Sequence, residues 1–290
     1  MTRAGSWSPT RPDFRKRAPN PQGVQRQYSG TAGRIENCQL GVFLTYTCAR
    51  GRALIDRELY LPKSWTDDPA RCAEAGIGDD VAFATKPQLA RVMLARVIAE
   101  HGRQAVPWFT ADEAYGDNPG LRTWLQAQQI NYVMAISCDQ HFSTPKGPRR
   151  ADHLAANAPR KGWQRLSAGL GSKGHRLYDW LLLDPGRGEH QLLVRRSIST
   201  PHELAYYIIH TRRPVPLVEL VRVAGSRWAV EETFQFTKNE TGLDHYQVRK
   251  YDAWYRHITL SMLAAAFLTV TAHRQRDHHE KGAPHPTTNA

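Results

Sequence analysis

The sequence predicts an α/β fold in which at least part of the sheet is parallel, and three observations support this class. Between residues 37 and 137, strand-like and helix-like patterns follow in the order strand, strand, helix, strand, helix, strand. Residues 139–215 are mainly strand-like, and residues 216–275 are mainly helical. Helices that alternate with strands are typical of sheets with parallel strands. Apolar residues make up 41% of the 290 residues, which is enough for a sizeable core.

The first two expected strands form a hairpin. Residues 37–48 (NCQLGVFLTYTC) and 51–62 (GRALIDRELYLP) are apolar, are rich in β-branched and aromatic types, and flank a turn that contains glycine. A helix is expected over residues 86–102, because apolar residues recur there at helical spacing and a glycine ends the run. These apolar residues are Leu89, Val92, Met93 and Val97.

A strand, a helix and a second strand follow. Residues 106–116 (VPWFTADEAYG) predict a short strand that ends in an acidic turn, and residues 118–129 predict a helix with proline near its start. Residues 131–137 (NYVMAIS) predict a buried strand. The mainly β segment over residues 139–215, which contains strand-like runs at 178–184, 190–197 and 203–211, is interpreted as an insertion.

The two ends of the chain differ from its middle. Residues 1–27 are basic, rich in proline and without periodicity, so we expect a disordered or extended segment before a domain over residues 28–275. Residues 276–290 predict a polar, flexible tail. The apolar run at 257–272 is too short and too closely bounded by charge for a membrane span, so a buried helix and no membrane partner are expected. Four cysteines without a C-x-x-C pair fit a reduced, cytoplasmic chain.

The charge balance predicts a polyanionic partner. The formal net charge is +12 at pH 7 and the pI is about 9.8, which favours nucleic acid. A soluble protein with a charged surface and no such partner has the same composition, so charge alone leaves both interpretations open.

Asp112 is the first candidate site residue. It follows the expected strand WFTA, and ligand sites in open α/β sheets lie at the carboxyl ends of strands. A carboxylate there can bind a hard divalent cation. The alternative is an acidic residue that caps the next helix, and position alone does not separate the two.

Glu231 is the second candidate. On a helix, Arg227, Glu231 and Lys238 fall within a narrow arc. Taken alone, the spacing favours a solvated ion pair between Arg227 and Glu231, worth tenths of a kcal/mol. The neighbouring Glu232 points elsewhere.

The combination resembles a known family. R-x3-E-x6-K at Arg227, Glu231 and Lys238 is similar to the signature of the DDE transposases of bacterial insertion sequences, although a tyrosine of the fuller form is replaced by Ala224. Four longer blocks resemble the same family, in the branch called the seven-oh-one type, and together the resemblance runs from about residue 23 to residue 270. They are QRQYSGTAGRIENCQLGVFLTY (25–46), LIDRELYLPKSWTDD (54–68), FTADEAYG (109–116) and GLDHYQVRKYDAWYRHITLSMLA (242–264).

The resemblance implies an RNase H-like mixed sheet flanked by helices, with a β-rich insertion before the last catalytic helix. It implies that Asp112 and Glu231 are catalytic and bind Mg²⁺ or Mn²⁺, and that Arg227 and Lys238 contact DNA. Carboxylates that hold two such ions allow cleavage of a phosphodiester and attack by the released 3′-OH. The implied partners are transposon ends, target DNA and further copies of the chain on DNA, in the nucleoid of a bacterial cytoplasm.

The first acid of the family has no counterpart. Relatives carry it in a stretch like D-x-T-G-F-x-K-K-G, and the matching residues 10–17 place Thr10 where the acid belongs. Asp13 lies three residues later, and an odd shift along a strand turns a side chain to the opposite face. The strand before this stretch and a DNA-binding N-terminal region are also expected to be absent. We therefore expect a truncated transposase with weak or no strand cleavage.

Two alternatives stay open. One is a non-catalytic DNA-binding or dimerisation remnant of a transposase, and the other is an unrelated metal-dependent nuclease that shares the fold. Metal-dependent cleavage separates the transposase from the remnant, and strand transfer into a second duplex separates it from the nuclease.

Overall fold

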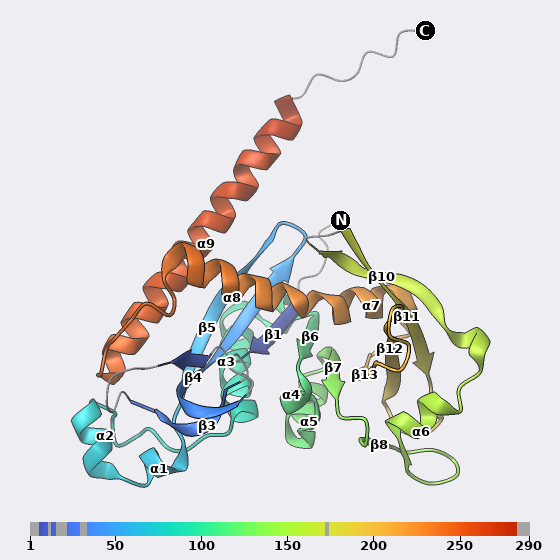
Figure 1. Ribbon diagram of the computed structural model, residues 1–290, viewed down its shortest axis with the longest axis horizontal. Helices are drawn as coiled ribbons and strands as arrows, with labels where there is room; N and C mark the ends of the chain where they lie inside the picture. Colours follow the sequence, from blue (N-terminus) through green and yellow to red (C-terminus); the bar gives the residue numbers. More distant parts are fainter. Residues whose placement is uncertain (1–5, 11–12, 16–21, 30–33, 172–173, 283–290) are drawn as a thin grey trace.

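The computed structural model describes residues 6–10, 13–15, 22–29, 34–171 and 174–282 (Figure 1). In the first half of the chain the strands are β1 (Ser6–Thr10), β2 (Asp13–Arg15), β3 (Gln25–Ser29), β4 (Arg34–Cys48), β5 (Gly51–Tyr60), β6 (Trp108–Ala111) and β7 (Asn131–Ile136). Six more follow: β8 (His141–Phe142), β9 (Arg149–Arg150), β10 (Gln164–Gly171), β11 (Gly174–Leu183), β12 (Gln191–Arg196) and β13 (Leu204–His210).

The helices are α1 (Lys63–Thr66), α2 (Pro69–Ala75), α3 (Lys86–His101), α4 (Glu113–Gly116), α5 (Pro119–Ala127), α6 (Ala151–Ala156), α7 (Leu217–Ser226), α8 (Trp228–Thr241) and α9 (Tyr251–Gly282). Two short 3-10 turns, η1 (Arg103–Ala105) and η2 (Arg160–Gly162), complete the described elements.

One mixed sheet holds the described part of the molecule together. Its main order is β10-β11-β12-β13-β7-β6-β1-β4-β2, with β3 and β5 also paired to β4. The strands β1, β6 and β7 are parallel to one another, whereas β4 runs antiparallel to β1. The inserted strands β10 to β13 form an antiparallel meander that joins the sheet through β13 and β7. The sheet is therefore extended by the insertion and not interrupted by it.

Local sequence accounts for the elements that were predicted. The hairpin is β4 and β5, and the expected helix over residues 86–102 is α3. Thr85 and Gln88 form a reciprocal capping box at the start of α3, and Gly102 ends it. The strand and helix pattern from residue 106 to residue 137 is β6, α4, α5 and β7. These predictions are confirmed because each depends on near neighbours in the chain.

The core consists of three clusters on the two faces of the sheet. The first lies between the sheet and α3, α4 and α5, and includes Phe109 and Met93. The second lies between the β4–β5 hairpin and the helices α8 and α9, and includes Phe43 and Trp254. The third lies under α7 and includes Trp108. The mixed sheet with helices on both faces and a β-rich insertion agrees with the fold class implied by the resemblance (Figure 1).

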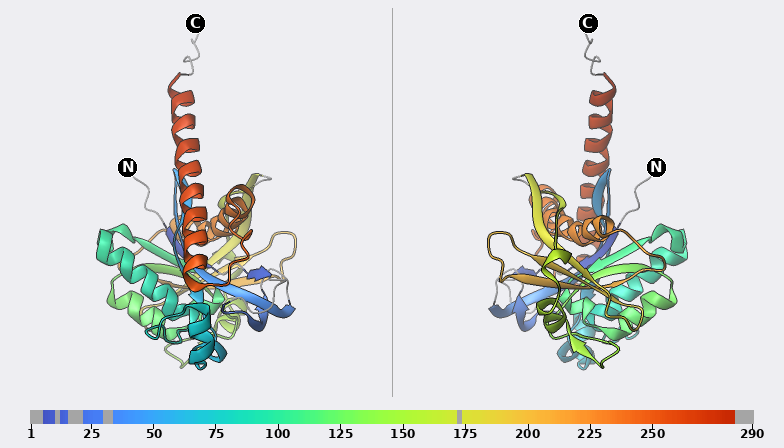
Figure 2. Two further views of the ribbon diagram at one scale, coloured as in Figure 1. Left: turned by 90° about the vertical axis from the view of Figure 1, so that its left-hand side faces the viewer. Right: turned by 90° about the vertical axis from the view of Figure 1, so that its right-hand side faces the viewer.

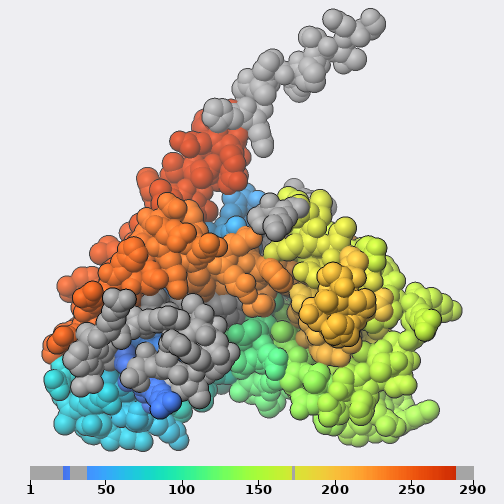
Figure 3. All heavy atoms as spheres, viewed as in Figure 1, coloured from blue at the N-terminus to red at the C-terminus, as the bar shows by residue number. Residues whose placement is uncertain are grey.

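Two expectations about the ends are wrong. Residues 6–10 and 13–15 were expected in a disordered or extended segment outside the domain, and the strand before the first-acid stretch was expected to be absent. Instead, β1 pairs with both β4 and β6 inside the sheet. Backbone hydrogen bonds from two neighbours place this strand, although its sequence shows no alternation. The tail was expected from residue 276, but α9 continues to Gly282 and projects from the rest of the described molecule (Figures 2 and 3).

Two further observations concern the helical and apolar segments. Among the described helices, none is both long and apolar enough to cross a bilayer. The run at 257–272 was expected to be a buried helix, yet within α9 only one side of it is buried.

Candidate functional site

Asp112 lies at the carboxyl end of β6, as expected. All four residues of β6 are buried, with Trp108 facing the cluster under α7 and Phe109 and Ala111 facing the opposite cluster. This alternation, continued by an extended backbone at Asp112, directs the half-buried carboxyl toward the face covered by α7. Asp112 also caps α4, because its Oδ1 accepts a hydrogen bond from the N–H of Ala114 at 3.1 Å. The capping interpretation is therefore correct, and it does not exclude a role as a ligand.

A close backbone contact holds this turn. A Cβ on Gly116 would lie 1.8 Å from the carbonyl oxygen of Ala135 in β7, so only glycine allows α4 to approach the strand this closely. Tyr115 beside it is fully buried. The position of Asp112 is thereby tied to both β6 and β7.

Three further acids surround Asp112, and the sequence interpretation did not single them out. The pKa of Glu113 is raised, first by partial burial and then by the negative charges of Asp117, Asp112 and Asp139. Asp117 accepts a hydrogen bond from the N–H of Ser137 at 3.1 Å. The sequence could have identified these acids by their positions just after two neighbouring parallel strands, because such strand ends meet at one edge of a sheet.

Thr10 lies beside Asp112 in the strand register. Ser6 and Trp7 of β1 pair with Trp108 and Phe109 of β6 in parallel. Continuing this register along both strands places Thr10 level with Asp112. Asp13 lies on β2 and pairs with Leu40, further along β4 than the partner of Thr10. The backbone thus places Thr10, and not Asp13, beside the second acid.

The helix α8 carries the remaining candidates. Arg227 Nη2 lies 3.2 Å from Oε1 of Glu231, whose side chain is 61% exposed. Lys238 instead pairs with Asp244 at 3.7 Å, and Glu232 pairs with Arg52 of β5. Of the predicted residues, the structure therefore brings Arg227 and Glu231 into contact, and it holds Lys238 two turns away in a different ion pair.

Two contacts show how α8 crosses the sheet. At its start, the guanidinium of Arg195 in β12 lies over the ring of Trp228, 5.9 Å from the ring centroid. Further along, Phe234 packs edge-on against Phe43 of β4, with ring centroids 5.3 Å apart.

The helix α8 packs on β5, α9 and α7. In Figure 1 it crosses in front of the sheet between α9 and α7, and Glu231 lies in its first turn.

The donors fit a divalent cation in kind but not in number. Carboxylate oxygens suit hard cations. Within the described ranges, however, no group of three or more His, Cys, Asp or Glu side chains could hold a metal ion. Asp112 and Glu231 alone do not fit a site for two ions.

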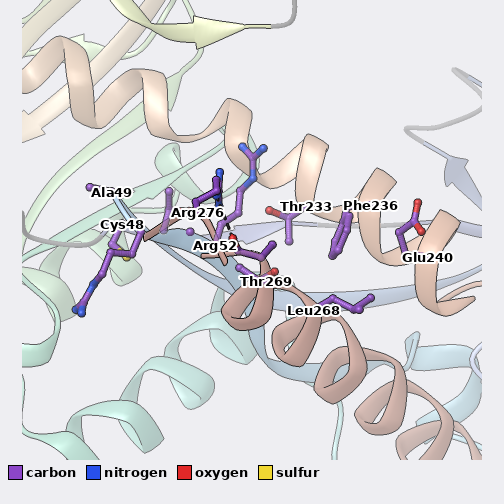
Figure 4. Close-up of a pocket in the computed structure, with 13 residues that line it drawn as sticks. Cys48, Ala49, Arg52, Thr233, Phe236, Glu240, Leu268, Thr269 and Arg276 are labelled. Atoms are coloured by element: carbon purple, nitrogen blue, oxygen red, sulfur yellow. Dashed lines mark hydrogen bonds between the residues drawn. The ribbon is translucent and has the colours of Figure 1, made fainter. Parts of the chain in front are cut away.

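A groove near α8 is lined by several arginines. It lies between the tip of the β4–β5 hairpin, α8 and α9, and holds about 560 Å³. Figure 4 shows Arg52 and Arg276 close together at one end, with Phe236 further along α8. Arg50 also lines this groove. Such a surface can contact phosphate groups.

Solved structures support the fold. The chain is similar to the piggyBac transposase in its synaptic complex with hairpin DNA, with a TM-score of 0.50 and 12% identity over 97% of this chain and 49% of that chain. This chain thus spans about half the length of that transposase. The NurA nuclease from Sulfolobus solfataricus is similar at a TM-score of 0.35 and 7% identity, over 97% of this chain and 84% of that chain, which is too low to bear on the fold.

Sequence comparisons give a family. No curated protein matches the chain. The family model described as DDE superfamily endonuclease matches residues 13–176, which include Asp112 but neither β1 nor α8. Enzymes of this superfamily use divalent metal ions. The match covers more than half of the sequence, and the chain therefore belongs to the DDE superfamily of endonucleases.

Proposed function

We propose that the protein is a DDE-type DNA transposase of a bacterial insertion sequence whose strand cleavage is impaired because Thr10 stands where the first acid belongs. The observation that carries this proposal is the parallel pairing of β1 with β6, whose register places Thr10 level with Asp112. Asp112 and Glu231 are the proposed catalytic residues and the ligands of Mg²⁺ or Mn²⁺. With the third carboxylate missing, the ions would be held weakly or not at all.

The proposed DNA binding rests on the net charge and on partly exposed basic side chains. Arg227 and Lys238 are 25% and 22% exposed and pair with acids that a DNA phosphate could replace. The arginine-lined groove beside the hairpin tip adds a second cationic surface. The proposed partners are transposon ends, target DNA and further copies of the chain on DNA, in the nucleoid of a bacterial cytoplasm.

Substitution of Thr10 by aspartate tests the proposal. The wild-type protein and the Thr10→Asp variant would be incubated with Mg²⁺ or Mn²⁺ and a supercoiled plasmid that carries the ends of the element. We expect little nicking by the wild type and a clear gain for Thr10→Asp, because position 10 is level with Asp112 when the register of β1 and β6 is continued along both strands.

Three controls make the test specific. Thr10→Asn changes the shape in a similar way without the charge and should gain nothing. Adding Asp112→Asn or Glu231→Gln to the Thr10→Asp variant should abolish the gain. Efficient nicking by the wild type would refute the impairment, and a folded Thr10→Asp variant without any gain would refute the proposed role of this position.

A second candidate is a non-catalytic DNA-binding remnant. The ion pair between Glu231 and Arg227 and the exposure of Glu231 favour it. It predicts DNA binding that weakens steeply with salt and no nicking by any variant. A simple nuclease, the third alternative, would nick DNA without joining the released 3′ end to a second duplex.

A further inference from the structure

The first turn of α8 carries a large aromatic side chain on the side away from the sheet. The buried side chains of α8 are Ala229, Val230, Thr233, Phe234 and Thr237. At 100° per residue they share one arc of the helix, and Trp228 lies opposite the middle of that arc. Trp228 is nevertheless only partly exposed. Side chains that approach from the outer side of α8 therefore cover it.

Two arginines of the β-rich insertion provide this cover. The guanidinium carbon of Arg176 in β11 lies 5.0 Å from the ring centroid of Trp228, and that of Arg195 in β12 lies 5.9 Å from it. Arg195 also lies over the ring of Tyr178, 4.7 Å from its centroid. Contacts between a cation and the face of an aromatic ring are favourable. We call Trp228, Arg176 and Arg195 the insertion clamp.

Strand geometry and the lack of competing partners direct the two arginines to the ring. A Cβ on Gly171 would lie 3.2 Å from Cγ of Arg176, so the side chain of Arg176 runs along β10 where glycine leaves room. Arg195 pairs with Trp180 in β11, which puts it on the same face of the sheet as Tyr178. Within the described ranges, neither arginine forms an ion pair with a carboxylate. The aromatic contacts therefore determine where the two guanidiniums lie.

The insertion also contacts the end of α7, immediately before α8. A Cβ on Gly225 would lie 1.9 Å from the carbonyl oxygen of Ala168 in β10, so the last turn of α7 packs directly on the backbone of the insertion. A single residue, Arg227, separates α7 from α8, and the start of α8 has no side-chain cap. Figure 1 shows α7 beside the strands of the insertion and α8 leading away from it across the sheet. The insertion therefore contacts the chain on both sides of the junction between α7 and α8.

The insertion clamp and the core hold opposite sides of the turn that carries Glu231. Val230 is buried in the cluster beside the β4–β5 hairpin. It lies roughly 200° around the helix from Trp228, and Glu231 lies about 60° from Trp228. We propose that Trp228 is a positioning residue for Glu231, because the insertion clamp prevents rotation of the first turn and so fixes the direction of the Glu231 carboxylate. This role rests on the proposed function, in which Glu231 is catalytic, and deepens it by giving the β-rich insertion a task in positioning.

Distance measurements by electron paramagnetic resonance test the direction of position 231 without DNA or metal. In a background with Cys48 and Cys138 replaced by serine, nitroxide labels would be attached to Glu231→Cys and Val92→Cys; the two remaining cysteines are buried. Val92 lies on α3, on the other face of the sheet. Its side chain is 47% exposed and that of Glu231 is 61% exposed, so the fold should accept both labels. We expect one narrow distance distribution for this parent chain.

Removal of the ring should release the turn. A contact between a cation and an aromatic face favours the state that makes it by a factor of about five, so Trp228→Ala should raise the population at other distances by about tenfold or more. The Arg176→Gln/Arg195→Gln variant should do the same, and Trp228→Phe, which keeps an aromatic face, should restore the narrow distribution. Phe236→Ala is the matched control, because Phe236 is 36% exposed on the same helix and its loss should leave the distribution unchanged.

Nicking kinetics test whether the direction of Glu231 matters for the reaction. In the Thr10→Asp background, Trp228→Ala should lower kcat about tenfold and leave KM for DNA unchanged, and Trp228→Phe should restore kcat. An unchanged distance distribution or an unchanged kcat in Trp228→Ala would overturn the positioning role, and so would a raised KM, which would assign Trp228 to DNA binding. If Thr10→Asp gains no nicking, the proposed function fails, whereas the distance distributions still decide whether the insertion clamp fixes the turn.

Discussion

His190 makes the stability of the fold depend on pH. Its Nε2 lies 2.7 Å from the hydroxyl of Tyr132, which can donate to the neutral ring, and 3.3 Å from Nε2 of Gln126. Burial, and to a smaller extent the nearby positive charges of Arg122 and His210, lower the pKa of His190 from 6.5 to about 4. Protonation therefore costs more in the folded protein than in the unfolded chain.

The sign and size of the effect follow from this shift. Because the pKa of His190 is lower in the folded state, the unfolded chain binds more protons at acidic pH. The stability contribution is fully present above the unfolded value of 6.5, falls as the pH drops below it, and levels off near 4. A shift of this size corresponds to at most about 3 kcal/mol, of which about 2 kcal/mol is lost by pH 5.

Urea unfolding of the wild type and of His190→Gln measures this loss. The free energy of unfolding would be determined at about pH 5 and about pH 7.5. We expect the decrease toward acid to be about 2 kcal/mol smaller in His190→Gln. His245→Gln is the control, because that side chain is 77% exposed and its loss should leave the wild-type decrease unchanged. An equal decrease in wild type and His190→Gln would show that the buried ring does not control the acid sensitivity.

Three further predictions concern packing and DNA. A Cβ on Gly225 would lie 1.9 Å from the carbonyl oxygen of Ala168, so Gly225→Ala should lower the free energy of unfolding by about 2 kcal/mol or more. In the control Gly120→Ala, the nearest atom to the new Cβ is 3.4 Å away, and the free energy of unfolding should not fall. Thermal melts of the two variants distinguish these outcomes. Phe234→Ala should lower the free energy of unfolding measured in urea by about 3 kcal/mol. Phe236 is 36% exposed, so Phe236→Ala should lower it much less. Equal losses would contradict the role of Phe234 in anchoring α8. Arg227→Ala should reduce the slope of log DNA affinity against log salt by about one; an unchanged slope would remove Arg227 from the DNA contact.

Several parts of the fold follow from local sequence. The β4–β5 hairpin, α3 with its capping box and the buried strands β6 and β7 each depend on residues that are neighbours in the chain. The same holds for Asp112, which a strand pattern and an acidic turn place at a sheet edge, and for the ion pair of Arg227 with Glu231, which helical spacing predicts. The roles of these residues in catalysis and DNA binding stay predictions.

Other features depend on contacts between distant segments. The strand β1 has no periodic pattern, and its place is decided by backbone pairing with β6, about a hundred residues later in the chain. The acids around Asp112 meet because the ends of β6 and β7 lie side by side, and this changes the pKa of Glu113. The apolar run in α9 carries apolar residues on both faces, so packing on α8 and β5 decides which face is buried.

By itself, the sequence determined the succession of elements, the basic charge and the positions of the candidate acids, because side-chain pattern and turn chemistry act over a few residues. Only the tertiary structure decided that β1 pairs in parallel with β6, that α8 packs on the β4–β5 hairpin through Phe234, and that one side of α9 stays exposed. These features depend on strand pairing and on the packing of segments far apart in the chain, which no local pattern encodes.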